Sequence, residues 1–187
     1  MDRAEKLARR DVDGSAQKEQ WDADAQALVD DTIDWEEMIS RSYPRDWEEL
    51  SAKKQKQFMG LMRQLIEASY KSKLKTAFRE KNKAKREDLD IEWLEESVKG
   101  EKGSLEASVR ADQRLVFLKF YVIRHREAWR VWDLKIDGAS TVRTYRSQFR
   151  NIYKTEGGWD GLITRLEKKL EDVKAGRADI TASINRE

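Results

Sequence analysis

The stretch that decides the fold is Trp129–Ile163, which reads WRVWDLKIDGASTVRTYRSQFRNIYKTEGGWDGLI. It begins as a strand led by tryptophan, passes through a turn, and continues as two amphipathic segments on either side of Gly157-Gly158. These segments, residues 143–154 and 159–173, have the apolar spacing of helices. The stretch therefore predicts one strand followed by two closing helices.

Further helices are predicted in the N-terminal half of the chain. From Trp21 the apolar residues follow helical spacing, and Asp34 is a good N-cap for a short second helix that Pro44 ends. The clearest helix opens at Ser51 and runs to about Thr76. Its apolar stripe is broader than a surface helix requires, so we expect it to line the interior.

Four strand candidates, joined by short connections, lie between the helical segments. In the first, Ile91 and Trp93 alternate with acidic residues, the pattern of a half-buried strand. The third is apolar on both faces, so we expect both sides to be covered. His125, in the loop after it, is interpreted as an exposed polar residue rather than a ligand. The strand candidates are residues 89–98, 103–112, 114–124 and 129–137.

The order of helices, antiparallel strands and closing helices favours an α+β fold over a doubly wound parallel sheet. We predict a four-stranded, curved antiparallel sheet with helices packed on its concave face, an NTF2-like or cystatin-like cone around an apolar pocket. One domain is expected over residues 21–175. It lies between a polar, frayed or weakly helical N-terminal arm (1–20) and a C-terminal tail (176–187).

Composition excludes several kinds of site. The chain has 187 residues and no cysteine, which excludes disulfides, thiolate catalysis and cysteine zinc sites; its one histidine argues against a histidine-rich metal site. The 38 basic residues nearly cancel the 36 acidic ones, which indicates solvated helix faces rather than a nucleic-acid interface. No apolar run approaches the length that crosses a bilayer, and the first residues lack an apolar secretory core.

Two blocks of sequence match one known family in order and spacing. The strand WRVWDL, the turn Gly138-Ala139-Ser140 and the pentad YRSQF (Tyr145–Phe149) form the first block, and residues 33–70 form the second. The chain thereby resembles the MlaC family, the phospholipid-binding component of the Mla (maintenance of lipid asymmetry) transport system, also called toluene-tolerance auxiliary proteins. It departs from the family at Trp132 and Ala139, where tyrosine and valine are usual.

The resemblance implies a periplasmic, monomeric carrier that buries the acyl chains of a phospholipid in an apolar pocket. It implies that the carrier shuttles lipid between an inner-membrane ABC transporter complex and an outer-membrane lipoprotein complex, with phospholipid as its ligand. No cofactor, metal, nucleic acid or catalytic step is implied. Burying one chain of about 16 carbons is worth on the order of 12 kcal/mol, so only an enclosed apolar cavity can replace the membrane.

Candidate pocket walls come from the long helix, the sheet and the first closing helix. Small alanines on a concave sheet leave room for a ligand, and methionines adapt to varied chains. An ordinary close-packed core made of the same residues is the alternative. The candidate wall residues are Phe58, Met62, Leu65, Ile66, Tyr70, Leu105, Ala107, Val109, Phe117, Val131, Leu134, Ile136, Tyr145 and Phe149.

Three polar residues, Asp133, Tyr145 and Arg146, allow several roles. Arg146 is a candidate for contacting a lipid phosphate at the pocket mouth. Asp133 is interpreted first as a structural acceptor of hydrogen bonds from Arg146 or from the turn. Alternatively, Asp133 and Tyr145 form the acid/base pair of an enzyme acting on a hydrophobic small molecule. A ligand-free structural adaptor with a solid core is the third possibility.

Overall fold

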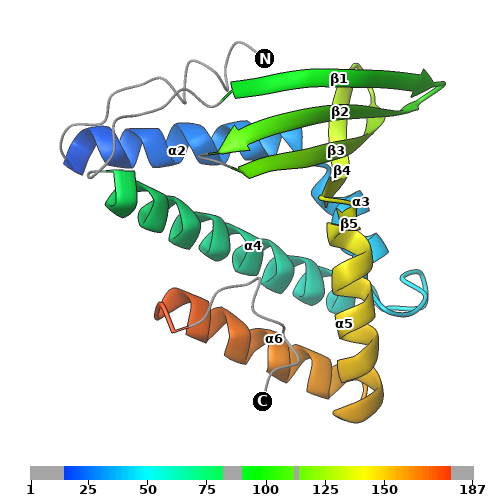
Figure 1. Ribbon diagram of the computed structural model, residues 1–187. Helices are drawn as coiled ribbons and strands as arrows, with labels where there is room; N and C mark the ends of the chain where they lie inside the picture. Colours follow the sequence, from blue (N-terminus) through cyan, green and yellow to red (C-terminus); the bar gives the residue numbers. More distant parts are fainter. Residues whose placement is uncertain (1–14, 82–89, 112–113, 178–187) are drawn as a thin grey trace.

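The computed structural model describes residues 15–81, 90–111 and 114–177, and it has the predicted α+β fold (Figure 1). Most of the predicted N-terminal arm and of the C-terminal tail lies outside the described residues. The helices are α2 (Ser15–Thr32), α3 (Trp35–Ser42), α4 (Ala52–Lys81), α5 (Thr141–Thr155) and α6 (Trp159–Lys174). The strands are β1 (Asp90–Lys99), β2 (Lys102–Ala111), β3 (Arg114–His125), β4 (Ala128–Ile136) and β5 (Ala139–Ser140).

The sheet is an antiparallel meander in which each strand pairs with the next. The four predicted strands are confirmed, but the sheet has five, because the chain folds back through Gly138 (φ +84°) and two residues pair with the end of β4. Register shifts after Trp93 and after Tyr121 mark bulges, which bend strands. Figure 1 shows the result: β4 crosses the direction of β1, β2 and β3.

Short polar side chains cap the starts of α3 and α5. Asp34 caps α3 by accepting from the backbone N–H of Glu37 at 3.0 Å, as predicted. Ser140 caps α5 by accepting from the N–H of Arg143 at 3.1 Å. Two helices are longer than predicted, since α2 already includes Ser15 and α4 continues past Thr76. No glycine or proline interrupts either extension, so nothing in the local sequence stops the helix.

The connection between α5 and α6 depends on glycines. Gly157 and Gly158 have φ values of +87° and +73°, which side chains other than glycine rarely adopt. Gly161, inside the first turn of α6, serves another purpose: a Cβ there would lie 1.6 Å from the carbonyl oxygen of Glu156. The tight link between the two helices therefore requires close backbone approach as well as positive φ.

The main core lies among the helices, and we call it the helical core. Its aromatic centre is formed by Tyr43, Phe58 and Phe149, whose rings meet edge to face at 5.3 and 5.7 Å. All of its buried residues come from helices or from the residue after α3. They are Ile39, Tyr43, Phe58, Met62, Leu65, Phe149, Ile152, Leu162, Ile163, Leu166, Leu170 and Val173.

The sheet meets the helices mainly at β4 and β5. Helices α3 and α5 contact β4, and α2 ends beside it, where the N–H of Asp34 donates to the carbonyl of Val131 at 2.9 Å. Figure 1 shows α2 between the sheet and α4, with α6 beyond α4. The predicted half-burial of the first strand is wrong, since β1 is the far edge and its Ile91 and Trp93 are each 48% exposed.

Candidate functional site

The pairing register divides the side chains of the sheet between two faces of different chemistry. Ala107 pairs with Leu118 on one face, and its neighbour Ser108 pairs with Phe117 on the other. The first face is mainly apolar, and we call it the apolar sheet face, although the register also places Glu96 and Arg124 near its edges. Its apolar residues are Ile91, Trp93, Val98, Leu105, Ala107, Val109, Val116, Leu118, Phe120, Val122, Trp129, Val131, Leu134 and Ile136.

Burial on the apolar sheet face falls from its middle to its ends. Ala107 and Val122 are 1% and 6% exposed, whereas Trp93 and Ile136 are 48% and 45% exposed. None of these residues belongs to the helical core; other parts of the chain bury Ala107 and Val122, whereas Trp93 and Ile136 keep much of their apolar area exposed. A contiguous, partly exposed apolar surface of this kind is typical of a binding surface.

The opposite face of the sheet is mixed. It carries an ion pair between Lys119 and Glu106 at 2.5 Å, together with the buried Ser108 and Asp133. Phe117, a predicted wall residue, lies on this face at 53% exposure, apart from Leu105 and the others. The third strand is apolar at successive positions, so its sequence does not indicate on which face of the sheet Phe117 lies. The pairing of the strands shows the face. The expectation that both sides of this strand are covered fails at Phe117.

The remaining predicted wall residues fall into two separate groups. Those on the sheet lie on the apolar sheet face: Leu105, Ala107, Val109, Val131, Leu134 and Ile136. Those on the helices belong to the helical core or pack against it: Phe58, Met62, Leu65, Ile66, Tyr145 and Phe149. The side chain of Tyr70 lies outside the described residues. An apolar stripe on a helix has the same spacing whether it faces a cavity or a packed core, which is why the sequence did not separate the groups.

Asp133 has a structural set of partners. It is 4% exposed, and its two carboxylate oxygens accept hydrogen bonds from the Ser140 hydroxyl at 2.6 Å and from the backbone N–H of Val142 at 3.0 Å. The turn and the first residues of α5 are thereby fixed to β4. Arg146, whose side chain is exposed on α5, is not one of these partners.

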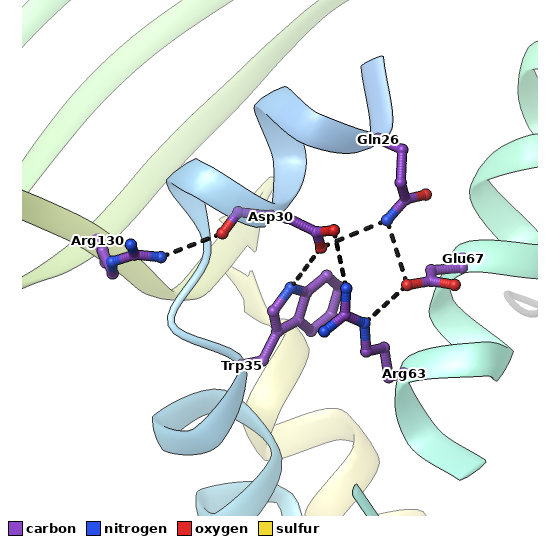
Figure 2. A network of polar contacts seen from close by, with 6 residues as sticks. All are labelled: Gln26, Asp30, Trp35, Arg63, Glu67 and Arg130. Carbon is purple, nitrogen blue, oxygen red and sulfur yellow. Dashed lines mark hydrogen bonds and ion pairs between the residues drawn. The ribbon is translucent and has the colours of Figure 1, made fainter. Parts of the chain in front are cut away.

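A polar network joins α2, α3, α4 and β4, as Figure 2 shows. The carboxylate of Asp30 accepts from the indole N–H of Trp35 at 3.0 Å and from Arg63 at 2.8 Å. Arg63 also donates to Glu67 at 2.8 Å, and this bond raises the pKa of Arg63. On the other side, Arg130 donates to the backbone carbonyl of Asp30 at 3.1 Å. The network connects the sheet to α4 through α2, and sequence analysis missed it.

His125 is exposed, as predicted, but it also has a partner. Its side chain is 60% exposed, and its Nδ1 lies 2.8 Å from the carboxylate of Asp34, the buried N-cap of α3. The β3–β4 hairpin is thus attached to the start of α3. A metal site is not formed: no group of three or more acidic or histidine side chains in the described residues could hold an ion.

Two clefts lie on the helical side of the molecule. One, of about 480 Å³, is bounded by Arg45, Arg150, Tyr153 and Lys154 among others. The other, of about 450 Å³, is bounded by Trp35, Met59 and neighbouring residues of α4. Neither includes a residue of the apolar sheet face. None of the helices in the described ranges is long and apolar enough to cross a membrane.

Comparisons with known proteins identify a family and a similar fold. A family model described as MlaC protein matches residues 3–168. A solved structure of similar fold is that of a phospholipid-binding protein from Ralstonia solanacearum in complex with a phospholipid. The two share 19% sequence identity at a TM-score of 0.66, over 81% of this chain and 83% of that chain. No curated protein matches the chain.

Proposed function

Because the chain belongs to the MlaC family, we propose that it is a carrier that binds phospholipid by its acyl chains along the apolar sheet face. The observation that carries the proposal is the segregation of apolar residues on that face, away from the helical core. The Ralstonia solanacearum protein of similar fold, which holds a phospholipid, supports the same ligand class.

The enclosed pocket expected from the sequence does not correspond to either cleft described above, so the proposal places the acyl chains on the extended apolar sheet face. A methylene removed from water is worth about 0.8 kcal/mol, and acyl chains differ in length and in the position of their double bonds. A surface that includes Val109 and Trp93, side chains of different size on adjacent strands, accommodates a chain without requiring one fixed shape. Binding of this kind needs no catalytic group, and the carboxylate of Asp133 is already held by its structural partners.

We further propose that the protein carries phospholipid through the periplasm, between an inner-membrane ABC transporter complex and an outer-membrane lipoprotein complex. The family's place in the Mla system supports it. Burial of a chain of about 16 carbons is worth on the order of 12 kcal/mol, so spontaneous release into water is slow. A partner complex must therefore offer a continuous apolar path when lipid is transferred.

A pair of variants tests the assignment of the binding face. Trp93 and Phe117 are aromatic, similarly exposed (48% and 53%), and located on opposite faces of the sheet. Trp93→Asp places a charge against the acyl chains, and we expect the phospholipid retained on gentle purification to fall at least about tenfold. Phe117→Asp, the matched control, is expected to retain it.

Native mass spectrometry of the intact chain measures the bound lipid, and uptake from phospholipid vesicles gives a second measure. If the unaltered protein neither carries nor takes up phospholipid, the carrier function is rejected. If both variants lose lipid equally, the function stands but the assignment to the apolar sheet face is wrong.

A further inference from the structure

Helix α5 carries four basic residues and no acidic one, although the whole chain is nearly neutral. The basic residues are Arg143, Arg146, Arg150 and Lys154, and all four are exposed. At about 100° per residue they fall within an arc of about 80° on the helix surface. We call this row of cations the α5 basic stripe.

Helix stability does not account for the stripe. Arg143 lies in the first turn of α5, where the helix dipole disfavours a cation. Arg146 and Arg150, like Arg150 and Lys154, are like charges four residues apart, a spacing that destabilises a helix. None of the four forms an ion pair within the part of the chain that the structure describes. Only Lys154, in the last turn of α5, is favoured by the helix dipole, so the row as a whole is more simply explained by an external anion.

The surroundings of the stripe indicate which anion. Ser147 and Asn151, which alternate with the cations along the chain, are exposed and polar. The aromatic residue that borders the stripe, Tyr153, packs against the helical core, so the exposed surface is mainly polar rather than the apolar anchor that protein interfaces bury. Three of the four cations are arginines, whose planar fork of donors matches phosphate. From Arg143 to Lys154 the stripe runs about 16 Å, enough to meet several lipid head groups.

The far end of the stripe opens on the cleft of about 480 Å³, where Arg45 joins Arg150 and Lys154. Asp46 and Glu49 also border this cleft and partly offset its charge. The part of the stripe outside this cleft is its first half, at Arg143 and Arg146.

We propose that the α5 basic stripe docks the protein onto the anionic phospholipid head groups of a membrane surface. The stripe supplies charge and donors, and the apolar sheet face is left for the acyl chains of the cargo. Docking is a property additional to lipid binding, and it is measured separately.

The test is co-sedimentation of the full chain with vesicles. We expect binding to phosphatidylcholine vesicles that contain about one-third phosphatidylglycerol, weakening with added salt, and little binding to pure phosphatidylcholine. Removing two cations in Arg143→Gln/Arg146→Gln should lower the partition coefficient about 30-fold. Arg143→Lys/Arg146→Lys should largely retain it.

The matched control removes two exposed cations elsewhere. Lys99→Gln/Lys102→Gln, at the β1–β2 hairpin, changes the net charge by the same amount and should alter binding less than about threefold. Thermal melting should show the Arg143→Gln/Arg146→Gln variant as stable as the unaltered protein or more so, because unfavourable charges are removed.

Three results would overturn the proposal: no binding of the unaltered chain to the anionic vesicles at low salt, equal losses in both double variants, or unchanged binding in Arg143→Gln/Arg146→Gln. The last would assign the stripe to a different partner, such as an acidic protein. A carrier that fails this test can still hold phospholipid in native mass spectrometry, so the two proposals fail independently.

Discussion

Asp133 links the last long strand to the helix that follows it. Ser140 donates to Asp133 through its hydroxyl and accepts from the N–H of Arg143, so one serine is both a partner of the buried carboxylate and the N-cap of α5. Val142 supplies a second donor from the backbone. This arrangement satisfies a buried charge with hydrogen bonds, which burial requires.

Asp133→Asn is expected to lower the free energy of unfolding by about 1–3 kcal/mol, because an amide cannot accept both hydrogen bonds as the carboxylate does. The amount of bound phospholipid should be unchanged. Chemical denaturation and native mass spectrometry measure the two quantities. Loss of lipid without loss of stability would instead place Asp133 in the binding site.

Tyr43 predicts a pH dependence. Its burial in the helical core, together with the neighbouring Tyr153, raises the pKa of Tyr43 from 10.0 to about 12. The unfolded chain loses this proton at lower pH than the folded chain does. The stabilisation is therefore complete below pH 10.0 and is lost as the pH rises through about 12.

Tyr43→Phe removes this titration, so its melting temperature should fall less steeply than that of the unaltered protein between pH 10.0 and about 12. Thermal melts across that interval measure the two slopes. Parallel curves would show that Tyr43 does not contribute to alkaline unfolding.

At the scale of elements, the network around Asp30 joins α2 to α4 through polar contacts. Gln26 adds a second bridge, donating to Glu67 at 3.2 Å. The spacing of Arg63 and Glu67 along α4 is visible in the sequence as a pair four residues apart, but its extension to Asp30 of α2 is not. Such a contact appears only when the two helices are placed side by side.

Asp30→Ala should lower the free energy of unfolding by about 1–2 kcal/mol, since Trp35 loses its acceptor and Arg63 keeps only its bond to Glu67, while the ion pair itself is partly exposed. High salt should screen the ion pair in the unaltered protein, so the difference in stability between the two proteins should be smaller at high salt. Urea denaturation measures it. Glu48→Ala, at an exposed acidic side chain outside the network, is the control and should change stability little.

The whole molecule consists of two parts with different packing. The helical core is filled by side chains from α3, α4, α5 and α6, whereas the sheet joins it mainly through β4 and β5 (Figure 1). The outer strands have few helical neighbours, and the residues of β1 from Ile91 to Lys99 are exposed. We infer that the cargo lipid supplies packing that the outer part of the sheet lacks.

Hydrogen exchange of the intact chain should reflect these two parts. Amides of the helical core, such as those around Phe58 and Leu166, should exchange most slowly, and those of β1 and β2 faster. Loading with phospholipid should slow exchange in the sheet while leaving the helical core almost unchanged. Equal slowing throughout the chain, or none in the sheet, would contradict binding at the apolar sheet face.

Local patterns predicted the elements well and the partners of the elements poorly. The cap at Asp34, the alternation in 103–112 and the stretch Trp129–Ile163 each define an element through contacts within a few residues, and the structure confirms them. The short strand β5 was missed because its two residues pair only after the turn has formed. The sequence also did not show which side chains of β3 lie on which face of the sheet, because that depends on pairing with β2 and β4.

By itself, the sequence determined the α+β class, the order of helices and strands, and, through two matching blocks, the MlaC resemblance, because each depends on periodicity or on motifs that are local in the chain. Only the tertiary structure decided that Phe58 and Met62 pack into a helical core while Leu105 and Val109 lie on a separate apolar sheet face. Apolar residues are chemically alike, and their role is set by the surface that they meet, which distant parts of the chain supply.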